Sequence, residues 1–444
     1  MFASIDAIYS LYRKHPHICT DTRTLKEGEI FVALHGERFD GNRYAQDALA
    51  KGAVAAIVDD PNLGEVQGCL RVRDTLVALQ ELATHHRKQL QIPVIGITGT
   101  NGKTTTKELI RSVLEQKYTI LATEGNLNNH IGVPLTLLKL TEHHEMALVE
   151  MGAGAPGEIR TLVEIARPTV GLITNVGKAH LQGFGSIQGV LETKSELPEY
   201  LYKNGGSFLL NSDDPLLTDR WASMHPLTFG KAGEYVRGEV SSLVPHLCVS
   251  WQENGTTSHL VNTNLVGAYN LGNVLAAIAM GKFFDVPSSL IIEGIEAYVP
   301  TNSRSQYVTL RSGTALIIDA YNANPSSMKA ALENLLATPA AAHIAILGDM
   351  LELGTAAEEE HRAVINFLQR HTEIDPLLCG TLFHRLAPKN IPSFPDLESL
   401  MKCLEEHPIP KKGVVLIKGS HGVGLQRLAD YLQQDHEGEG IDLR

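Results

Sequence analysis

One short stretch, residues 93–107 with the sequence PVIGITGTNGKTTTK, constrains this chain more than any other. It starts with a β-branched apolar run, which is typical of a buried strand. It then turns on Gly99 and Gly102 and continues with apolar residues at helical spacing. A strand, a glycine turn and a helix in this order form an anion cradle, because glycine lets the backbone approach a phosphate and the helix start offers free N–H groups. Lys103 is expected to reach the β- and γ-phosphates, and Thr104 to ligate Mg2+.

The loop is a shorter variant of the common phosphate-binding pattern G-x-x-x-x-G-K-[ST]. Counting back five residues from Gly102 falls on Ile97, whereas the glycine is at Gly99. An ordinary turn with a surface lysine is the alternative. That alternative requires a strand, two glycines, a lysine and a threonine to meet in one loop by chance, so we favour a site for nucleotide phosphate. The loop does not specify the reaction.

Length and charge narrow the class of protein. A chain of 444 residues is too long for one core, so about two to four domains are expected. An apolar content of 43% with 20% charged residues is ordinary for a soluble globular protein. The net charge of -12, without a long basic run, argues against nucleic acid as the main partner.

Cysteine use and hydropathy bear on the compartment. The five cysteines are scattered and form no C-x-x-C pair, which fits a reducing compartment and neither a disulfide framework nor a zinc site. The N-terminus lacks a charged-then-apolar signal pattern, and no apolar run reaches the ~20 residues of a membrane span. We therefore expect a cytoplasmic protein.

Alternating strand and helix patterns predict an α/β protein with three domains, at residues 1–85, 86–299 and 300–444. The first is a small α/β unit, and a helix over residues 74–90 crosses its boundary. The second has mainly parallel strands after the loop, then an alternating, Gly-punctuated region at 225–266 that predicts a small antiparallel sheet. The third alternates strand and helix throughout, which predicts a doubly wound parallel sheet.

Three polar side chains follow or flank these predicted elements. Glu150 ends a buried strand close to the phosphate loop, where a Mg2+ ligand belongs. His180 follows another strand and could ligate a divalent ion, although a lone histidine is more often structural. Lys194 lies between two glutamates in a predicted helix over residues 186–202, and by pattern alone it is a solvated surface residue.

Other polar segments leave alternatives open. Thr22 and Arg23 precede a strand and could hold an anionic or uracil-bearing ligand, but composition alone favours a turn with an Arg–Asp pair. The asparagine-rich loop 124–134 suits a peptide or sugar, or is a turn without a ligand. Segment 267–273 opens a helix, and its amides either meet a purine ring or cap that helix.

At residues 98–104, TGTNGKT, the chain resembles the Mur ligase family, the ATP-dependent amide-forming enzymes of peptidoglycan precursor synthesis. The resemblance covers nearly the whole chain. Its further motifs are FVALHGERFDG at 31–41, NLNNHIGVP at 126–134, NVGKAHL at 175–181, YNANP at 321–325 and LGDMLELG at 347–354. Together they point to the family member that joins D-alanyl-D-alanine to UDP-N-acetylmuramoyl-tripeptide.

The resemblance implies an ADP-forming acid–D-amino-acid ligase that works through an acyl phosphate, as the last cytoplasmic step of peptidoglycan UDP-precursor synthesis. Its cofactors would be ATP and Mg2+, and it would act as a monomer on small-molecule substrates. The first domain would bind the UDP-sugar-peptide. The central domain would be a P-loop-type ATPase domain with a mainly parallel sheet, and the C-terminal domain would be Rossmann-like.

The resemblance also implies roles for residues. The ATP-binding set is Gly99, Thr100, Asn101, Gly102, Lys103, Thr104, Thr105, Asn270, Asn273, Arg304, Asp319 and Tyr321. The Mg2+ set is Thr104, Glu150, His180 and Lys194, the lysine as a carbamate, which would overturn its surface interpretation. Catalysis would rest on Lys103, Lys194, His180 and Arg304, and the UDP-muramoyl-peptide would contact Thr22, Arg23, Asn128 and Asn129. Two positions depart from the family pattern: His421 stands where many relatives have Arg, and Ser303 where Gly is usual.

Three alternatives were weighed against this assignment. A relative adding diaminopimelate, lysine or glutamate is the nearest, but the D-N-P-R motif of diaminopimelate-adding relatives is absent. A folylpolyglutamate-synthase-like ligase shares the loop but lacks a UDP-binding first domain. A nucleotide-binding regulator without catalysis is disfavoured because Glu150, His180 and Lys194 are all present.

Overall fold

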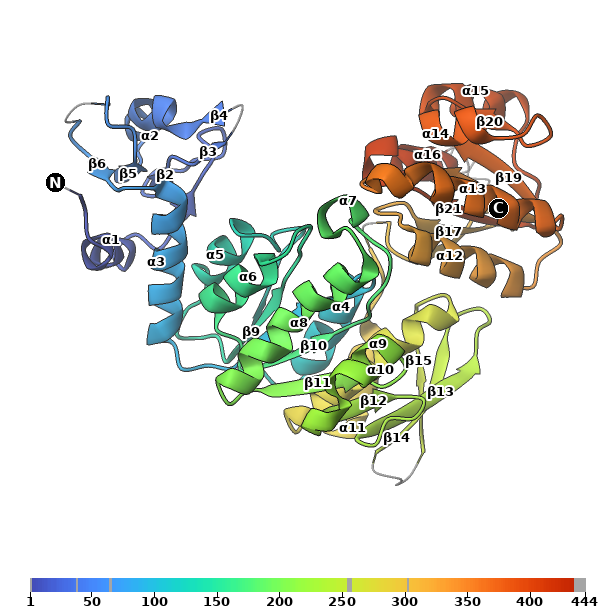
Figure 1. The fold of residues 1–444 in the computed structure, drawn as a ribbon, viewed down its shortest axis with the longest axis horizontal. Coiled ribbons are helices and arrows are strands. Elements are labelled where there is room, and N and C mark those ends of the chain that lie inside the picture. Colours follow the sequence, from blue (N-terminus) through green and yellow to red (C-terminus); the bar gives the residue numbers. More distant parts are fainter. Residues whose placement is uncertain (1, 37–38, 64–65, 254–257, 302, 435–444) are drawn as a thin grey trace, which may run out of the picture.

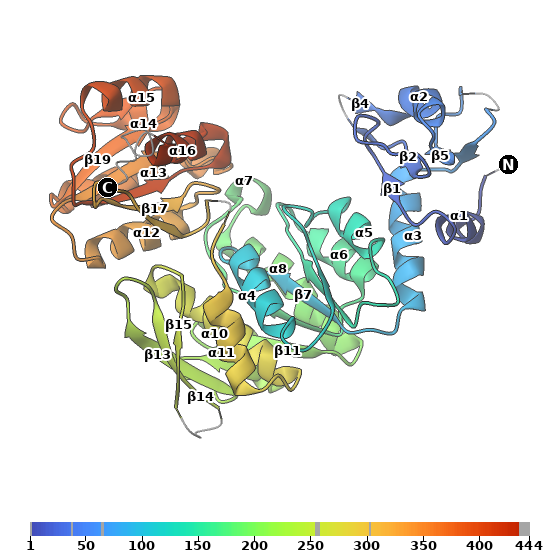
Figure 2. The same cartoon turned by 180° about the vertical axis from the view of Figure 1, so that it is seen from behind.

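The computed structural model describes residues 2–36, 39–63, 66–253, 258–301 and 303–434. Three α/β units follow one another along the molecule, as Figure 1 and the reverse view in Figure 2 show. Their sheets have four, nine and six strands in the described residues, with a separate two-stranded hairpin in the first unit. The predicted three-domain α/β architecture is confirmed.

The N-terminal unit is built on a parallel sheet with strand order β1-β2-β5-β6. Its strands are β1 Ile18–Cys19, β2 Ile30–Val32, β5 Ala55–Val58 and β6 Cys69–Arg71, with the hairpin β3 His35–Gly36 and β4 Phe39–Asp40. Its helices are α1 Ile5–Tyr12 and α2 Ala45–Ala50. The hairpin lies within the FVALHGERFDG stretch at 31–41, whose residues 37–38 lie outside the described part.

Helix α3, Thr75–Gln89, joins the first unit to the second. Its N-cap is Asp74, whose side chain accepts a hydrogen bond from Val77 N. The helix contacts α1 on one side and α5 and α6 of the central unit on the other. Its buried Leu79 and Leu82 therefore belong to one apolar core that runs from the N-terminal unit into the central one.

The central sheet has the order β15-β14-β13-β12-β11-β10-β7-β9-β8. Its strands are β7 Val94–Thr98, β8 Ile120–Ala122, β9 Met146–Glu150, β10 Val170–Ile173, β11 Ser207–Asn211, β12 Leu227–Gly230, β13 Val236–Ser242, β14 Cys248–Glu253 and β15 His259–Asn262. Pairing is parallel from β8 to β13 and antiparallel from β13 to β15. The antiparallel pairing expected at 225–266 is present between β13, β14 and β15. These strands do not form a sheet of their own, because β12 pairs with β11 and β13 with β12, so that they extend the parallel sheet.

Helices cover both faces of this sheet. They are α4 Lys103–Leu114, α5 Gly132–Leu137, α6 Glu158–Ala166, α7 Leu181–Phe184, α8 Ile187–Lys203, α9 Pro215–Trp221, α10 Leu271–Phe283 and α11 Ser288–Ala297. Neighbouring residues of one strand point to opposite faces, so Val94 packs with α5, α6 and α8 while Ile95 packs with α4, α10 and α11. Burial on both faces explains the continuous apolar runs of the parallel strands.

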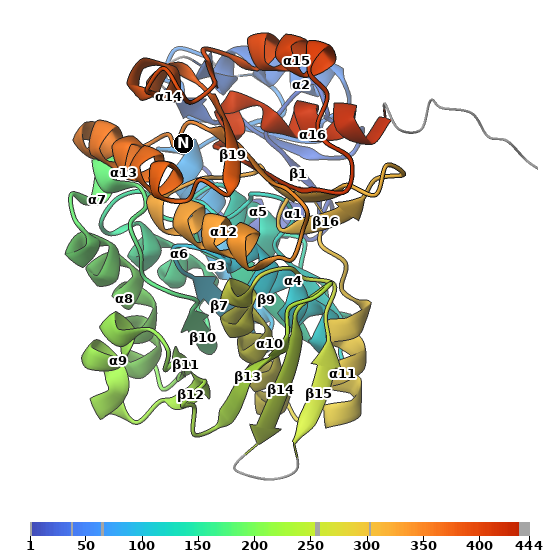
Figure 3. The same ribbon diagram turned by 90° about the vertical axis from the view of Figure 1, so that its right-hand side faces the viewer.

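The C-terminal unit is doubly wound, as predicted, with the order β16-β17-β21-β18-β19-β20 and only β16 antiparallel in the described part (Figure 3). Its strands are β16 Gln306–Thr309, β17 Ala315–Asp319, β18 His343–Gly348, β19 Ile374–Cys379, β20 Ser393–Phe394 and β21 Val414–Lys418. Its helices are α12 Pro325–Ala337, α13 Ala357–Arg370, α14 Thr381–Leu386, α15 Leu397–Glu406 and α16 Leu425–Gln434. No helix in the described residues has the length and apolarity needed to span a bilayer.

Candidate active site

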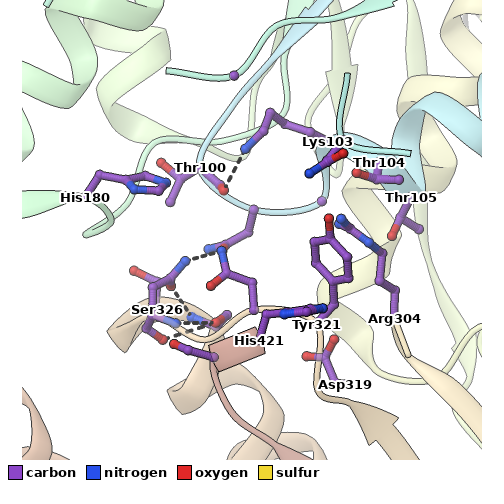
Figure 4. A pocket seen from close by; sticks show the side chains of 18 of the residues that line it. Thr100, Lys103, Thr104, Thr105, His180, Arg304, Asp319, Tyr321, Ser326 and His421 are labelled. Carbon is purple, nitrogen blue, oxygen red and sulfur yellow. Dashed lines mark hydrogen bonds between the residues drawn. The ribbon is translucent and has the colours of Figure 1, made fainter. Parts of the chain in front are cut away.

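A cavity of about 730 Å³ lies between the central and C-terminal units and is lined by residues of both. Figure 4 shows Lys103 and Thr104 on one wall, with Asp319, Tyr321 and His421 on the other. The sequence-predicted residues that line it are Thr100, Asn101, Gly102, Lys103, Thr104, Thr105, Asn128, Asn129, Glu150, His180, Asn270, Asn273, Arg304, Asp319, Tyr321 and His421. The structure thus gathers most of the predicted set at one place.

The phosphate loop leaves no room for side chains at its two glycines. Gly99 has φ +151°, and a Cβ atom there would lie 1.8 Å from Thr174 Oγ1. Gly102 has φ +77°, and its Cβ would lie 2.5 Å from Asn273 Oδ1. At both positions the backbone conformation favours glycine, and the side chain of Thr174 or Asn273 lies too close to leave space for a Cβ atom. The loop then enters α4 directly at Lys103.

Lys103 is folded against its own loop. Its Nζ donates to the carbonyl oxygens of Gly99, at 2.8 Å, and Thr100, at 3.2 Å. Burial lowers the pKa of Lys103, the nearby Glu150 carboxylate opposes that shift, and the Arg304 cation adds to it. Two cations facing one cavity make a site with affinity for negative charge.

Thr104 and Glu150 meet beside the loop. Thr104 Oγ1 donates to Glu150 Oε2 at 2.9 Å, and Asn128 Nδ2 donates to Glu150 Oε1 at 2.8 Å. Glu150 ends β9 and is buried. A hydroxyl and a carboxylate are hard oxygen donors of the kind that Mg2+ prefers. Among the described residues no three His, Cys, Asp or Glu side chains cluster as a metal site.

Lys194 is buried, with 3% of its surface exposed, and its Nζ donates to Gly99 O at 3.0 Å. The surface interpretation of Lys194 is therefore wrong. That interpretation relied on the flanking glutamates being solvated, but Glu196 is itself buried and accepts hydrogen bonds from the backbone N–H groups of Gly157 and Arg160. Burial, followed by the neighbouring Lys103, lowers the pKa of Lys194 well below the usual lysine value.

His180 lies at the mouth of the cavity and makes an interdomain contact. Its Nδ1 is 2.7 Å from Glu352 Oε2 in the C-terminal unit. Burial lowers the pKa of the imidazole; Glu352 opposes this shift, and Lys103 and Lys194 add to it. Sequence reasoning did not identify Glu352, although it lies within the quoted motif at 347–354.

Asn270 and Asn273 form a small amide network at the start of α10. Asn273 Nδ2 donates to Asn270 Oδ1 at 2.7 Å, and Asn273 Oδ1 accepts from Thr106 Oγ1 at 3.0 Å. Asn270 Nδ2 donates to Val266 O at 2.8 Å. Neither side chain caps the helix, so the capping alternative is wrong. The network ties the helix to the phosphate loop.

The opposite wall comes from the carboxyl ends of β17 and β21. The Arg304 guanidinium lies 3.7 Å from the centroid of the Tyr321 ring, and His421 meets that ring edge-on. Asp319 pairs with Lys418 Nζ at 2.5 Å. Lys418 is a cavity residue that sequence reasoning did not single out. The sequence alone does not reveal it, because only the structure shows that the strands ending in Asp319 and Lys418 are neighbours.

Further polar contacts join the two units at the cavity. Asn324 Nδ2 donates to Asn101 Oδ1 at 2.7 Å, and Lys178 Nζ donates to Glu360 Oε1 at 2.7 Å. The backbone N–H of Lys178 also donates to Ser326 Oγ at 3.2 Å. Asn324 additionally caps α12, so one side chain links that helix to the phosphate loop. These positioning contacts were not predicted.

The remaining predicted substrate residues are held by local contacts. Arg23 is 87% exposed and pairs with Asp21 at 2.5 Å, and its hydrogen bond lowers the Asp21 pKa to about 2. Neither Thr22 nor Arg23 is among the residues that line the cavity. Asn129 Oδ1 accepts hydrogen bonds from the N–H groups of Ile131 and Gly132, as expected if the asparagine-rich segment is a turn. The residue also lines the cavity.

A parallel α/β sheet whose glycine loop opens into a helix at an interdomain cavity defines a nucleotide-phosphate-binding protein. Comparison with known families makes this class specific. Three family models match: the Mur ligase family catalytic domain at residues 16–98, the Mur ligase middle domain at 97–281, and the Mur ligase glutamate ligase domain at 303–421. The chain belongs to the Mur ligase family.

Curated relatives match over nearly the whole length. The UDP-N-acetylmuramoyl-tripeptide–D-alanyl-D-alanine ligase of Bacillus subtilis is 34% identical over 93% of this chain and 92% of its own. The Escherichia coli ligase of the same name is 33% identical over 94% of each chain. Among solved structures, MurF from Acinetobacter baumannii has a TM-score of 0.85 at 31% identity and covers 94% of this chain and 93% of its own. MurF from Thermotoga maritima, in complex with ADP, has a TM-score of 0.84 at 26% identity, over 96% and 98%.

Proposed function

We propose that this protein is an ADP-forming ligase that joins D-alanyl-D-alanine to UDP-N-acetylmuramoyl-tripeptide in peptidoglycan precursor synthesis. The observation that carries the proposal is the convergence of the phosphate loop, the Thr104–Glu150 pair and Arg304 on one cavity. The substrates are inferred from the names of the relatives that match over nearly the whole chain. ATP use follows from the same family and from the ADP complex of the Thermotoga relative.

The cavity suits activation of a carboxylate by ATP. The tripeptide carboxylate attacks the γ-phosphorus, ADP leaves, and an acyl phosphate forms. The amine of D-alanyl-D-alanine then attacks the acyl carbon through a tetrahedral intermediate, and phosphate leaves. Bringing a carboxylate to a triphosphate costs charge repulsion, which the cations of Lys103 and Arg304 offset. Alignment of the three substrates can contribute up to ~7–11 kcal/mol of the barrier reduction.

Mg2+ fits the donors present beside the loop. Thr104, Glu150, His180 and Lys194 are the residues proposed to hold it, with Lys194 carrying a carbamate. When bound, the cation neutralises charge on the transferring phosphoryl group. Lys194 fits a carbamate because only the neutral amine adds to carbon dioxide, and the buried Nζ has its pKa lowered. The modification would turn a buried amine into an anionic oxygen donor.

The other roles are proposals of the same kind. Asn270 and Asn273 contact the adenine, Asp319 and Tyr321 the ribose and adenine, and Asn128 and Asn129 the muramoyl-peptide. The UDP group binds the first unit near Thr22 and Arg23, where Arg23 would exchange Asp21 for phosphate. Residues 1–85 form the domain that binds the UDP-substrate, and residues 86–299 form the domain that binds ATP. Residues 300–444 form the domain that closes the site. We also propose that the protein is a monomer and that it acts in the cytoplasm, where ATP is supplied.

The test is phosphate release measured with ATP, UDP-N-acetylmuramoyl-tripeptide and one amine acceptor at a time. D-Alanyl-D-alanine is expected to support turnover, while diaminopimelate, lysine and glutamate are not. Lys103→Ala should abolish release, because the loop loses its cation, whereas Lys88→Ala, on the exposed surface of α3, should not change it. Turnover retained in Lys103→Ala, or faster with another acceptor, would refute the assignment. Nucleotide binding without release with any acceptor would favour the regulator class.

A further inference from the structure

The C-terminal unit contacts His180, a proposed metal ligand, through the side chain of Glu352. Its Oε2 lies 2.7 Å from Nδ1 of His180, which belongs to the central unit. Glu352 comes from the segment that follows β18, and His180 immediately precedes α7. The two residues are far apart in sequence, and they meet only because the two units dock at the cavity.

This contact selects one protonation pattern of the imidazole. A carboxylate accepts hydrogen bonds, so Nδ1 of His180 carries the proton and Nε2 keeps its lone pair. Within the described residues, Nε2 has no hydrogen-bond partner. Metal-ligating histidines commonly donate their second ring N–H to a carboxylate in this way, which fixes the tautomer and the ring orientation.

The backbone on both sides of the contact is constrained. His180 has φ +49° and Glu352 has φ +63°, a left-handed conformation that is uncommon outside glycine, although histidine adopts it more often than glutamate does. The segments pack closely: a Cβ atom on Gly354 would lie 3.2 Å from Cβ of Gln182. Unfavourable backbone conformations persist where the surrounding structure imposes them, often at functional sites.

We propose that Glu352 is a positioning residue that fixes His180 in the tautomer whose Nε2 can ligate a divalent cation. The cation site is then complete only when the C-terminal unit is docked on the central one. This inference rests on the proposed function, because it takes the cation to be the Mg2+ of an ATP-dependent ligase. It assigns a role to the glutamate of the LGDMLELG stretch.

The competing explanation is a simple docking contact. Glu352 is 64% exposed, and an exposed ion pair contributes little by itself. The matched control is Lys178→Met, which removes the neighbouring interdomain ion pair with Glu360 and does not touch the His180 ring. A docking role predicts that both substitutions act alike; a positioning role predicts that only Glu352 matters for the cation.

The experiment measures Mn2+ binding to the full chain by electron paramagnetic resonance, with a non-hydrolysable ATP analogue present. Glu352→Ala is expected to weaken Mn2+ binding about 10- to 100-fold, the range for loss of a partner of a metal-bound histidine. Glu352→Gln is expected to recover much of the loss, because its amide oxygen accepts the same N–H. Lys178→Met should change Mn2+ affinity less than about fivefold, the most that an exposed ion pair contributes to docking, and His180→Ala gives the loss of the ligand itself.

Nitrogen NMR of histidine-labelled protein supplies a readout that does not involve metal. The His180 signals, identified by their absence in His180→Ala, should show Nδ1 protonated in the wild type and a shift toward Nε2 protonation in Glu352→Ala. A simple docking contact would not require that shift.

The outcomes separate this inference from the proposed function. If His180→Ala weakens Mn2+ binding and Glu352→Ala does not, the positioning role is wrong and the ligase assignment stands. Equal losses in Glu352→Ala and Lys178→Met would also overturn it, in favour of docking. If neither His180→Ala nor Glu352→Ala changes Mn2+ binding, the metal role of His180 falls as well. Glu352 is exposed, so its variants should fold, and thermal unfolding checks that they do.

Discussion

The central unit meets its two neighbours through interfaces of different chemistry. Toward the N-terminal unit the contact is an apolar core, shared through α3, with Leu79 and Leu82 fully buried in it. Toward the C-terminal unit Val266 packs into the apolar core of that unit, but the contacts at the cavity are polar, between Asn324 and Asn101, Lys178 and Glu360, and Glu352 and His180. They surround the cavity rather than fill it.

This difference assigns different mechanical roles to the two interfaces. Separating an apolar core exposes carbon surface to water at roughly 25 cal/mol per Å², so the first two units should behave as one body. Polar contacts exchange with water at little net cost. The C-terminal unit is therefore the part expected to open and close, and the proposed ATP site is the cavity between this unit and the central one.

The largest effect should come from the apolar interface. Leu82→Ala leaves a cavity in the core shared through α3 and should lower the free energy of unfolding by about 2–5 kcal/mol. Urea unfolding is followed by circular dichroism and by the fluorescence of Trp221 and Trp251, both in the central unit. The fluorescence transition should shift to lower urea, because Leu82 shares its core with the central unit. Val77→Ala, at an exposed position of the same helix, is the control. A fluorescence midpoint left unchanged by Leu82→Ala would contradict a shared core.

A second prediction concerns pH and the C-terminal unit. Burial would raise the pKa of Asp349, but the neighbouring His361 ring and the N–H groups of Leu382 and Phe383, which donate to the carboxylate, outweigh it, so the pKa is lowered. A lowered folded pKa means stability that is present above the unfolded pKa of about 3.9 and is lost as pH falls through the folded value.

Asp349→Asn should therefore cost about 1–3 kcal/mol at neutral pH, because a buried N–H loses its acceptor, and the gap should narrow in acid. Circular dichroism measured from pH 7 to pH 2 checks this. Tryptophan fluorescence should miss the early acid change if the C-terminal unit unfolds on its own. A constant gap across this pH range would contradict the prediction.

A smaller effect is expected at the connection between the two units. Ser303 has φ +53°, where the family pattern has glycine. Ser303→Gly should relieve about 1 kcal/mol of left-handed strain, partly offset by the freer unfolded chain. Ser303→Ala keeps the Cβ atom and should gain nothing. Thermal unfolding of the two variants compares them; an equal gain would show that the hydroxyl, not the backbone, is responsible.

The smallest change should follow Lys178→Met. The lysine is half-exposed, so losing its pair with Glu360 should change stability by about 0.2–1 kcal/mol. The substitution should affect the separation of the C-terminal unit from the central unit more clearly than it affects unfolding. Small-angle scattering without nucleotide should show a larger radius of gyration than the wild type. A loss of several kcal/mol would mean that this interface is not the weak one.

Local sequence patterns predicted local structure well. The strand, glycine turn and helix of the phosphate loop, and the strand ending in Glu150, lie within a few residues of their expected bounds. What failed depended on packing between distant segments. Lys194 was assigned to the surface because its neighbours are charged, yet its burial is set by the sheet beneath α8. The strands at 225–266 looked independent because no local signal shows which sheet they join.

The site followed the same rule. Residues of one motif, such as Lys103 and Thr104, were found from spacing, whereas Lys418 and Glu352 become visible only when two strands or two units meet. The family resemblance corrected the assignment of Lys194, because it carries information about tertiary context that a single sequence does not display.

The shared core around α3 also decides where this chain can be cut or recombined. A fragment beginning at residue 86 would remove most of the helix and leave α5 and α6 without their apolar cover. A fragment beginning at Asp74 would retain both the helix and its N-cap. Chimaeras in which the first unit comes from a relative should therefore be joined ahead of Asp74. Their solubility, compared with that of chimaeras joined at residue 86, would test this choice of junction.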